Sequence, residues 1–266
     1  MPAKDRLDTS VIDAALGARV SRFGLQVLEA CESTNTCLRD APPPDDGRIH
    51  VVACESQTAG RGRRGRTWVS RPGESLTFSM LWRFAAGAPV PAGLSLVAGV
   101  ALARCLERLG VDGVQLKWPN DVLVLGRKLA GILVELVPGR GRTPAAVIGI
   151  GINVGSLDRD ALPAGVDACA LADVMAQVPS RSALLAALLA DFDDLLGTYE
   201  ATGFPALRQA WEQRNAHAGL PVEISGEARE IVGTCLGVDA DGALRIATDA
   251  GETRVLAGEV SLRPVA

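Results

Sequence analysis

Lysine and histidine are scarce in this sequence. Of its 27 basic residues, 24 are arginine and three are lysine, at positions 4, 117 and 128, and there are only two histidines. Coding bias can favour arginine, but it does not choose where the few lysines lie. Lys117 and Lys128 fall within twelve residues of each other. They therefore mark places where a compact ammonium group is required.

Several other features are missing. The six cysteines form no CxxC pair, so reduced, buried thiols are expected and a zinc site is not. No apolar run approaches the ~18 residues of a membrane-spanning helix, and the N-terminus lacks the apolar segment of a signal peptide. We therefore expect a cytoplasmic protein with no membrane association. A net charge of −4 argues against a general nucleic-acid-binding protein.

The most unusual stretch is an arginine–glycine segment, residues 60–66, in which four arginines and three glycines alternate without a hydrophobic residue. It lies between two strand-like runs, 49–54 and 75–82, so it is expected to be a loop between strands. Glycine allows close backbone approach to a ligand, and arginine offers forked donors that match carboxylate or phosphate. The pattern predicts a loop that closes over an anionic ligand and is mobile without it. A solvated basic loop is the simpler alternative, and the phosphate-binding GxxxxGK[ST] pattern is absent.

Hydrophobic periodicity predicts an α/β (α+β) fold with a mixed, largely antiparallel sheet and packed helices. Helices are expected at about 11–16, 34–40, 91–109, 181–201 and 205–214. Strands are expected at about 24–29, 49–54, 75–82, 114–117, 122–125, 128–136 and 145–154. The last four strands follow one another through tight turns, which fits an antiparallel arrangement better than a Rossmann fold.

The pattern changes after Gly219. Short strands alternate there with Ser-Gly, Asp-Gly and Ala-Gly turns and predict a small SH3-like β-barrel. These strands are expected at about 222–226, 229–238, 243–248, 252–257 and 259–262. We therefore expect two domains, residues 1–216 and 217–266.

Three local features have more than one interpretation. Ser33 or Thr34 is expected to cap the helix that follows, although a helix N-terminus with free N–H groups also makes a polar ligand pocket. Asn120-Asp121 alone is typical of an Asx turn. A glycine within a strand, such as Gly131, usually marks a bulge but also leaves room for a ligand.

Five segments together resemble the motif set of biotin–protein ligases, in the order and spacing of that family. They are Ser33–Asn35, Gln57–Arg66, Lys117–Asp121, Gly126–Glu135 and Gly149–Asn153. The C-terminal segments 237–244 and 258–263 resemble the final barrel of the family. The resemblance covers roughly residues 24–266, and a set of this kind is highly specific.

The resemblance implies a two-step reaction with biotin and ATP as substrates and Mg²⁺ as cofactor. The carboxylate of biotin attacks the α-phosphate of ATP, which releases pyrophosphate and leaves biotinyl-5′-AMP. A lysine of a biotin carboxyl carrier protein, from acetyl-CoA carboxylase or a related carboxylase, then takes the biotinyl group. An arginine-rich loop fits this chemistry, because two anions must be brought together away from water.

The resemblance also assigns residues to roles. The catalytic residues are expected to be Lys128, Arg63 and Asp121, with Asp121 either coordinating Mg²⁺ through water or accepting the proton of the incoming lysine. Biotin is expected to contact Ser33, Thr34, Asn35, Gln57, Arg61, Gly62, Arg63, Lys128 and Gly131. ATP and the adenylate are expected to contact Gly60, Arg61, Arg63, Arg66, Trp68, Asn120, Lys128 and Asn153.

The sequence departs from the best-known members in two respects. Only about twenty residues precede the similar region, too few for a helix-turn-helix domain, so a short form without DNA binding is expected; a homodimer is compatible with the sequence. The loop at 156–170 has no tryptophan to cover the adenine. A lipoate– or octanoate–protein ligase of the same architecture is the alternative enzyme, and a nucleic-acid-binding module using the arginine–glycine loop is the alternative of another class.

Overall fold

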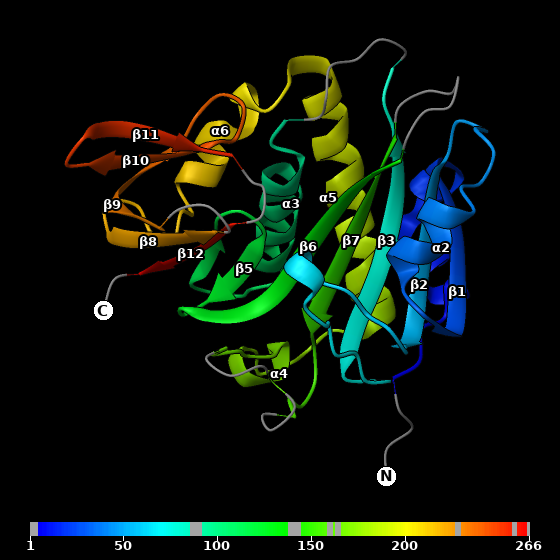
Figure 1. Cartoon of the computed structure of the whole chain (residues 1–266). Coiled ribbons are helices and arrows are strands. Elements are labelled where there is room, and N and C mark those ends of the chain that lie inside the picture. Colours follow the sequence, from blue (N-terminus) through cyan, green and yellow to red (C-terminus); the bar gives the residue numbers. More distant parts are fainter. Residues whose placement is uncertain are drawn as a thin grey trace.

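The computed structural model describes residues 5–85, 92–137, 145–158, 162, 166–226, 230–256 and 260–264. The start of the helix expected from residue 91 and much of the loop 156–170 lie outside these ranges. Two sheets organise the described chain, a large one built from the first half of the sequence and a small one at the C-terminal end (Figure 1). Across the ranges just given, no helix combines the length and apolar character needed to cross a membrane.

The large sheet has seven strands in the order β1-β2-β3-β7-β6-β5-β4. Only the β1–β2 pair is parallel, and every other neighbouring pair is antiparallel. The strands are β1 (Phe23–Cys31), β2 (Ile49–Gln57), β3 (Ser75–Arg83), β4 (Val114–Lys117), β5 (Asp121–Val124), β6 (Arg127–Val137) and β7 (Ala145–Asn153). The expected mixed, largely antiparallel sheet is confirmed.

Alternation along the central strands gives the sheet two different faces. In β7 the isoleucines at 148, 150 and 152 join the main core, whereas Gly149 and Gly151 belong to the lining of a cavity. Phe78 of β3 packs edge-to-face on Phe192 of α5, with ring centroids 6.5 Å apart. Because the chain covers both faces, Ser75, Thr77 and Ser79 of β3 are buried as well. A strand that alternates polar and apolar residues therefore does not have a solvated side here.

Helices cover both sides of the large sheet. α3 and α5 pack on each other, α1 packs on α5, and α3 also contacts β4, β5 and β6; α2 packs instead on β2, β3 and β7. The helices are α1 (Thr9–Leu16), α2 (Thr34–Asp40), α3 (Leu94–Arg108), α4 (Leu171–Val174), α5 (Arg181–Thr202) and α6 (Pro205–Glu212). Short 3₁₀ turns occupy η1 (Gly17–Arg22) and η2 (Arg63–Gly65). α5 begins where predicted, since the Ser180 hydroxyl accepts a hydrogen bond from the backbone N–H of Ala183 at 3.2 Å.

The small sheet contains five antiparallel strands in the order β11-β10-β9-β8-β12. They are β8 (Pro221–Gly226), β9 (Glu230–Val238), β10 (Leu244–Thr248), β11 (Gly251–Val255) and β12 (Val260–Pro264). The strand positions match those expected from the turn sequences. Pairing of β11 with β12, which would close the expected barrel, is not recorded for the residues described.

The C-terminal part of the chain contacts the β4–β5 end of the large sheet through backbone pairing and through Trp118. The segment that follows α6 pairs with the outer strand β4, where Leu116 N–H donates to Arg214 O (2.7 Å) and Ala216 N–H donates to Leu116 O (2.9 Å). The indole N–H of buried Trp118 donates to Gly242 O in the turn between β9 and β10 at 3.1 Å. The turn that carries Asn120 and Asp121 is therefore braced from the C-terminal side.

Candidate active site

A cavity of about 180 Å³ lies on the face of the large sheet that carries α2. Its walls are the N-terminus of α2, the arginine–glycine loop, the turn between β4 and β5, and strands β6 and β7. Every residue that the sequence assigned to biotin, to the nucleotide or to catalysis lines this cavity, except Gly60. Gly60 does not line the cavity, and a Cβ atom on it would overlap the carbonyl of Trp68. Five separate segments of the sequence thus converge on one cavity.

One end of the cavity is formed by the start of α2. Ser33 occupies the N-cap position, but its side chain makes no capping hydrogen bond, so the capping role expected for this hydroxyl is wrong. The free backbone N–H of Thr34 is instead bound by the Gln57 side-chain carbonyl at 2.8 Å. Gln57 therefore satisfies one of the free N–H groups at the helix N-terminus, and Ser33 and Thr34 both line the cavity.

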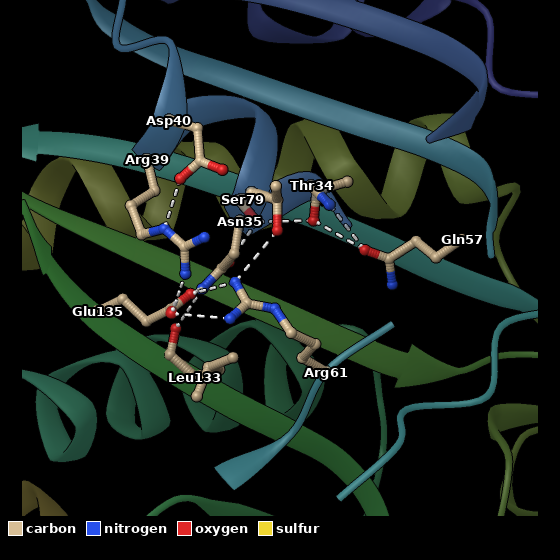
Figure 2. A network of polar contacts seen from close by, with 10 residues as sticks. Thr34, Asn35, Arg39, Asp40, Gln57, Arg61, Ser79, Leu133 and Glu135 are labelled. Carbon is tan, nitrogen blue, oxygen red and sulfur yellow. Dashed lines mark hydrogen bonds and ion pairs between the residues drawn. The ribbon is translucent and has the colours of Figure 1, made fainter. Parts of the chain in front are cut away.

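Ser79, a buried serine that the sequence did not assign to the site, links Thr34 and Asn35 at this end of the cavity. Ser79 of β3 is fully buried, and its Oγ lies 2.7 Å from Thr34 Oγ1 and 2.6 Å from Asn35 Oδ1 (Figure 2). Asn35 in turn packs so closely on Gly149 that a Cβ there would overlap its amide. Residues 75–82 alternate polar and apolar side chains, so the sequence shows that Ser79 lies on the polar face of a strand. It does not show that this face is turned toward the cavity.

Like Ser79, Glu135 of β6 was not assigned to the site from the sequence. Its carboxylate accepts hydrogen bonds from Asn35 Nδ2 (2.8 Å), Arg39 (2.9 Å) and Arg61 (2.9 and 3.1 Å) (Figure 2). Burial raises the pKa of Glu135, but the hydrogen bond from Asn35 and two neighbouring guanidinium groups outweigh burial and lower its pKa overall. The group is therefore an anion at neutral pH. Arg61 lines the cavity with its charge already paired.

The arginine–glycine loop is a tight hairpin at the mouth of the cavity. Gly62 N–H donates to Arg66 O at 2.7 Å, and Trp68 N–H donates to Gly60 O at 2.9 Å. Across the cavity, Arg63 donates to Asn120 Oδ1 at 3.2 Å. The loop thus contacts β6 through Arg61 and the β4–β5 turn through Arg63.

Two glycines make room for the Trp68 indole. A Cβ on Gly151 of β7 would overlap the indole, and a Cβ on Gly131 of β6 would touch it at 3.4 Å. The indole Nε1 is buried without a hydrogen-bond partner among the described groups. In this structure the space beside Gly131 is taken by the Trp68 indole and the Lys128 ammonium, and the room expected for biotin at Gly131 stays a prediction.

Lys128 and Asp121 form an ion pair inside the cavity, with Lys128 Nζ 2.6 Å from Asp121 Oδ1. In a regular strand Lys128 and Gly131 would point to opposite faces, because side chains alternate. The β5–β6 pairing skips Leu129, so one extra residue in β6 brings Lys128 to the face of Gly131. The bulge expected in this strand exists, but it lies at Leu129 rather than at Gly131.

The backbone around Lys128 is fixed by the segment that follows β7. Lys128 N–H donates to Asp167 O at 2.9 Å, and Cys169 N–H donates to Lys128 O at 3.0 Å. The Asn153 side chain donates to Cys169 O at 3.0 Å. Asn153 thus both lines the cavity and holds the segment beside Lys128.

The cavity lining is strongly cationic. Among the described lining residues, Asp121 carries the one carboxylate, whereas six side chains are positive: Arg61, Arg63, Arg64, Arg66, Lys117 and Lys128. The cations lie beside the neutral amides and hydroxyls at the α2 end. Such a site suits a ligand with a compact polar head, a carboxylate and several phosphates.

Family models match two parts of the chain. Residues 27–153 match the biotin/lipoate A/B protein ligase family. Residues 217–263 match the biotin protein ligase C terminal domain.

Curated relatives agree over most of the length. The chain is 37% identical over 237 residues to the bifunctional ligase/repressor BirA of Escherichia coli, covering 89% of this chain and 73% of that protein. It is 36% identical over 245 residues to the biotin–[acetyl-CoA-carboxylase] ligase of Paracoccus denitrificans, covering 88% and 98%.

A solved structure shares the architecture. The biotin protein ligase from Aquifex aeolicus in complex with biotin and ATP matches with a TM-score of 0.79 and 28% identity, covering 91% of this chain and 99% of that one. Sequence, domain content and fold therefore agree, and the chain belongs to the family of biotin protein ligases.

Proposed function

We propose that this cavity makes biotinyl-5′-AMP from biotin and ATP and then passes the biotinyl group to a lysine of a carrier protein. The observation that carries the proposal is the placement of a neutral hydrogen-bonding end, at Thr34, Asn35 and Gln57, next to the ammonium of Lys128 and the loop arginines in one cavity. The biotin relatives and the Aquifex structure with biotin and ATP support the same activity.

In the first step the residues bring two anions together. The ureido ring lies at the α2 end, and the carboxylate points toward Lys128. A carboxylate oxygen attacks the α-phosphorus, the bond to the bridging oxygen breaks, and pyrophosphate leaves. Lys128 and Arg63 offset the negative charge where the two reactants meet. The hairpin loop covers the cavity and excludes water that would hydrolyse the mixed anhydride.

In the second step the amine of the carrier lysine attacks the acyl carbon and AMP leaves with the bonding electron pair. The amine must lose a proton, and we assign this proton to Asp121, which carries the one carboxylate among the described lining residues. The Paracoccus relative is named for acetyl-CoA carboxylase. We accordingly propose a biotin carboxyl carrier protein as the acceptor.

Magnesium fits this cavity as a companion of the nucleotide rather than as a resident ion. The donor set offers the carboxylate of Asp121, already paired with Lys128, and the amide oxygens of Asn120 and Asn153. Mg²⁺ commonly takes one or two carboxylates and completes its shell with phosphate oxygens and water. Asp121 would hold it, and the ion would neutralise charge on the departing pyrophosphate.

The direct test is biotin-dependent exchange of labelled pyrophosphate into ATP, with lipoate and octanoate supplied in parallel. Exchange with biotin alone is the expected result. Exchange that follows lipoate or octanoate instead would assign the chain to the alternative ligase, and exchange with none of them would exclude acyl-adenylate chemistry.

The arginine–glycine loop is expected to respond to ligand. Glu135 offsets the charge of Arg61, but Arg63, Arg64 and Arg66 still carry like charges within residues 60–66, and the two anionic substrates reduce their repulsion. Hydrogen exchange of these amides should be fast in the free protein and slow by at least about tenfold with biotin plus ATP. Equal protection in the two states would show that the hairpin is closed regardless of ligand.

The C-terminal sheet is expected to raise the rate of turnover and to have little effect on biotin binding. None of its described residues lines the cavity, but Gly242 accepts the hydrogen bond of Trp118 beside Asn120 and Asp121. Ending the chain after residue 216 should therefore lower turnover while calorimetry still detects biotin. A truncated protein that keeps its circular dichroism spectrum but binds no biotin would contradict this division at residue 216.

A further inference from the structure

The hydrogen-bond chain that leads from Glu135 to the cavity has a fixed direction. Asn35 Nδ2 donates to Glu135 Oε2 (2.8 Å) and to Leu133 O (3.2 Å). A carboxylate anion and a backbone carbonyl can only accept, so the nitrogen of this amide must face them. The amide oxygen of Asn35 must then face Ser79 (Figure 2).

The next two groups have one proton each. The O–H of Ser79 is committed to Asn35 Oδ1 at 2.6 Å. The 2.7 Å contact between Ser79 and Thr34 therefore needs the proton of the Thr34 hydroxyl. The longer contact of that hydroxyl with Gln57 Oε1, at 3.3 Å, is left without a proton. If the Thr34 proton pointed to Gln57 instead, either short contact would become a repulsive approach of two oxygens.

Thr34 is thereby left with lone pairs and no proton for a ligand. Gln57 has the opposite polarity, since its carbonyl is occupied by the Thr34 backbone N–H at 2.8 Å and its NH₂ group remains to donate. The α2 end of the cavity hence offers an acceptor at Thr34 and a donor at Gln57. A ureido ring, with its N–H groups and its carbonyl, is complementary to this pair.

We propose that Glu135 is a positioning residue that sets the polarity of biotin recognition, by fixing through Asn35 and Ser79 that Thr34 accepts a hydrogen bond from a ring N–H of the ligand. This inference rests on the proposed function for the identity of the ligand. Glu135 itself does not line the cavity. It controls selectivity because a carboxylate at the end of the chain can only accept, so the order of protons cannot reverse.

The substitution Glu135→Gln tests this directly, because glutamine has the same shape but can donate. Glu135→Gln leaves only the longer contact to Leu133 O (3.2 Å) to hold the Asn35 NH₂ in place, and a glutamine NH₂ can face the oxygen of a rotated Asn35. The reversed chain, in which Thr34 donates to the ligand, thereby becomes accessible. The ligands are biotin and the two cyclic carbamates in which oxygen replaces one or the other ring N–H. Calorimetry measures the ratio of their dissociation constants for each protein variant.

The unaltered protein should bind the carbamate that lacks the N–H facing Thr34 about 10–100-fold more weakly than biotin, since two acceptors would then meet in a buried site. The ratio of interest is the dissociation constant of this carbamate divided by that of biotin. In Glu135→Gln it should fall by about tenfold, because a Thr34 hydroxyl that can donate tolerates the ring oxygen. Loss of the Arg61 contact would change the affinity for both ligands alike. The ratio therefore separates polarity from a general disturbance of the loop.

Two further variants complete the test. Ser79→Ala breaks the chain and should lower the same ratio, and adding Glu135→Gln to it should change the ratio no further. Arg39→Met removes another partner of Glu135, lies outside the cavity lining and leaves Asn35 untouched. It should keep the original ratio.

The inference is overturned if Glu135→Gln binds biotin and keeps the ratio, if Arg39→Met lowers the ratio equally, or if the unaltered protein binds biotin and both carbamates equally. If Glu135→Gln does not fold, the inference is overturned when Ser79→Ala binds biotin and keeps the original ratio. Failure of the proposed function is distinct, because the unaltered protein would then bind no biotin at all.

Discussion

Replacing Lys128 by methionine is expected to slow formation of biotinyl-5′-AMP by about 10²–10³-fold, the usual effect of removing one charged contact to a transition state. Methionine keeps the length of the side chain and removes only the charge. The ammonium lies within the cavity beside Gly131, where a Cβ atom would be 3.4 Å from Nζ. A point charge at this position can meet the biotin carboxylate and the α-phosphate together. The measurement is single-turnover adenylation with biotin and ATP.

Arginine at position 128 is expected to restore little of the rate. A planar guanidinium is wider than an ammonium, and the Trp68 indole and Asp121 already border the space around Nζ. Arg127→Met, which removes a cation from the same strand outside the cavity lining, is the matched control and should leave adenylation unchanged. If Lys128→Arg forms the adenylate at the parental rate, the argument from scarce lysines is wrong.

Lys128 stood out by its rarity and was assigned to the site by the resemblance, and it does line the cavity, but the reason its side chain points there could not be predicted. By alternation alone Lys128 and Gly131 belong to opposite faces of a strand. The extra residue Leu129 in the pairing of β5 with β6 reverses this. Glycine at 131 suggested a bulge, yet neither the position of the bulge nor its effect on Lys128 follows from residue types. Local patterns predict a strand more reliably than its pairing register.

Strands and helices were predictable because periodicity and turn residues are local. The limits of the expected helices and strands agree within a few residues, including the five short C-terminal strands, although the short helix α4 was not expected. Ser79 and Glu135 were not assigned to the site, although Glu135 lies within a segment that resembles the family. Their partners are distant in sequence, since Asn35 lies 44 residues from Ser79 and 100 residues from Glu135. Only the β3-β7-β6 order brings these three side chains together.

The hydrogen-bond partners of buried polar groups are equally hard to predict from the sequence. Ser75, Thr77 and Ser79 of β3 are buried, so each of these polar groups needs a partner. Which partner it finds depends on neighbouring strands. A sequence can show that a polar residue lies in a strand, whereas its hydrogen bonds require the pairing.

The ion pair between Lys128 and Asp121 changes what is expected of Asp121. In the structure Asp121 Oδ1 lies 2.6 Å from Lys128 Nζ, so we expect Asp121 to position Lys128 in addition to the proton transfer proposed for it. The arriving anions compete with Asp121 for the same ammonium. Adenylation would therefore draw Lys128 toward the ligand and leave the carboxylate available for the second step.

Asp121→Asn is accordingly expected to form biotinyl-5′-AMP at nearly the parental rate and to transfer it about 10²–10⁴-fold more slowly, the usual contribution of a general base. Asparagine keeps the shape and an oxygen for Lys128 but cannot take the proton of the acceptor amine. The transfer defect should shrink as the pH approaches ~10.4, the ordinary pKa of a lysine, because the amine then loses its proton to solvent. The measurement is single-turnover transfer from preformed biotinyl-5′-AMP to the carrier across this pH range.

Two comparisons decide between the roles of Asp121. Asp112→Asn changes an exposed carboxylate outside the cavity and should affect neither step. If Asp121→Asn slows adenylation as much as transfer, and the defect does not depend on pH, then the carboxylate acts by holding Lys128 or a magnesium ion. A defect confined to transfer and relieved at high pH is a result that the ion pair alone cannot produce, because loss of that contact would impair the step in which Lys128 meets the carboxylate and the α-phosphate.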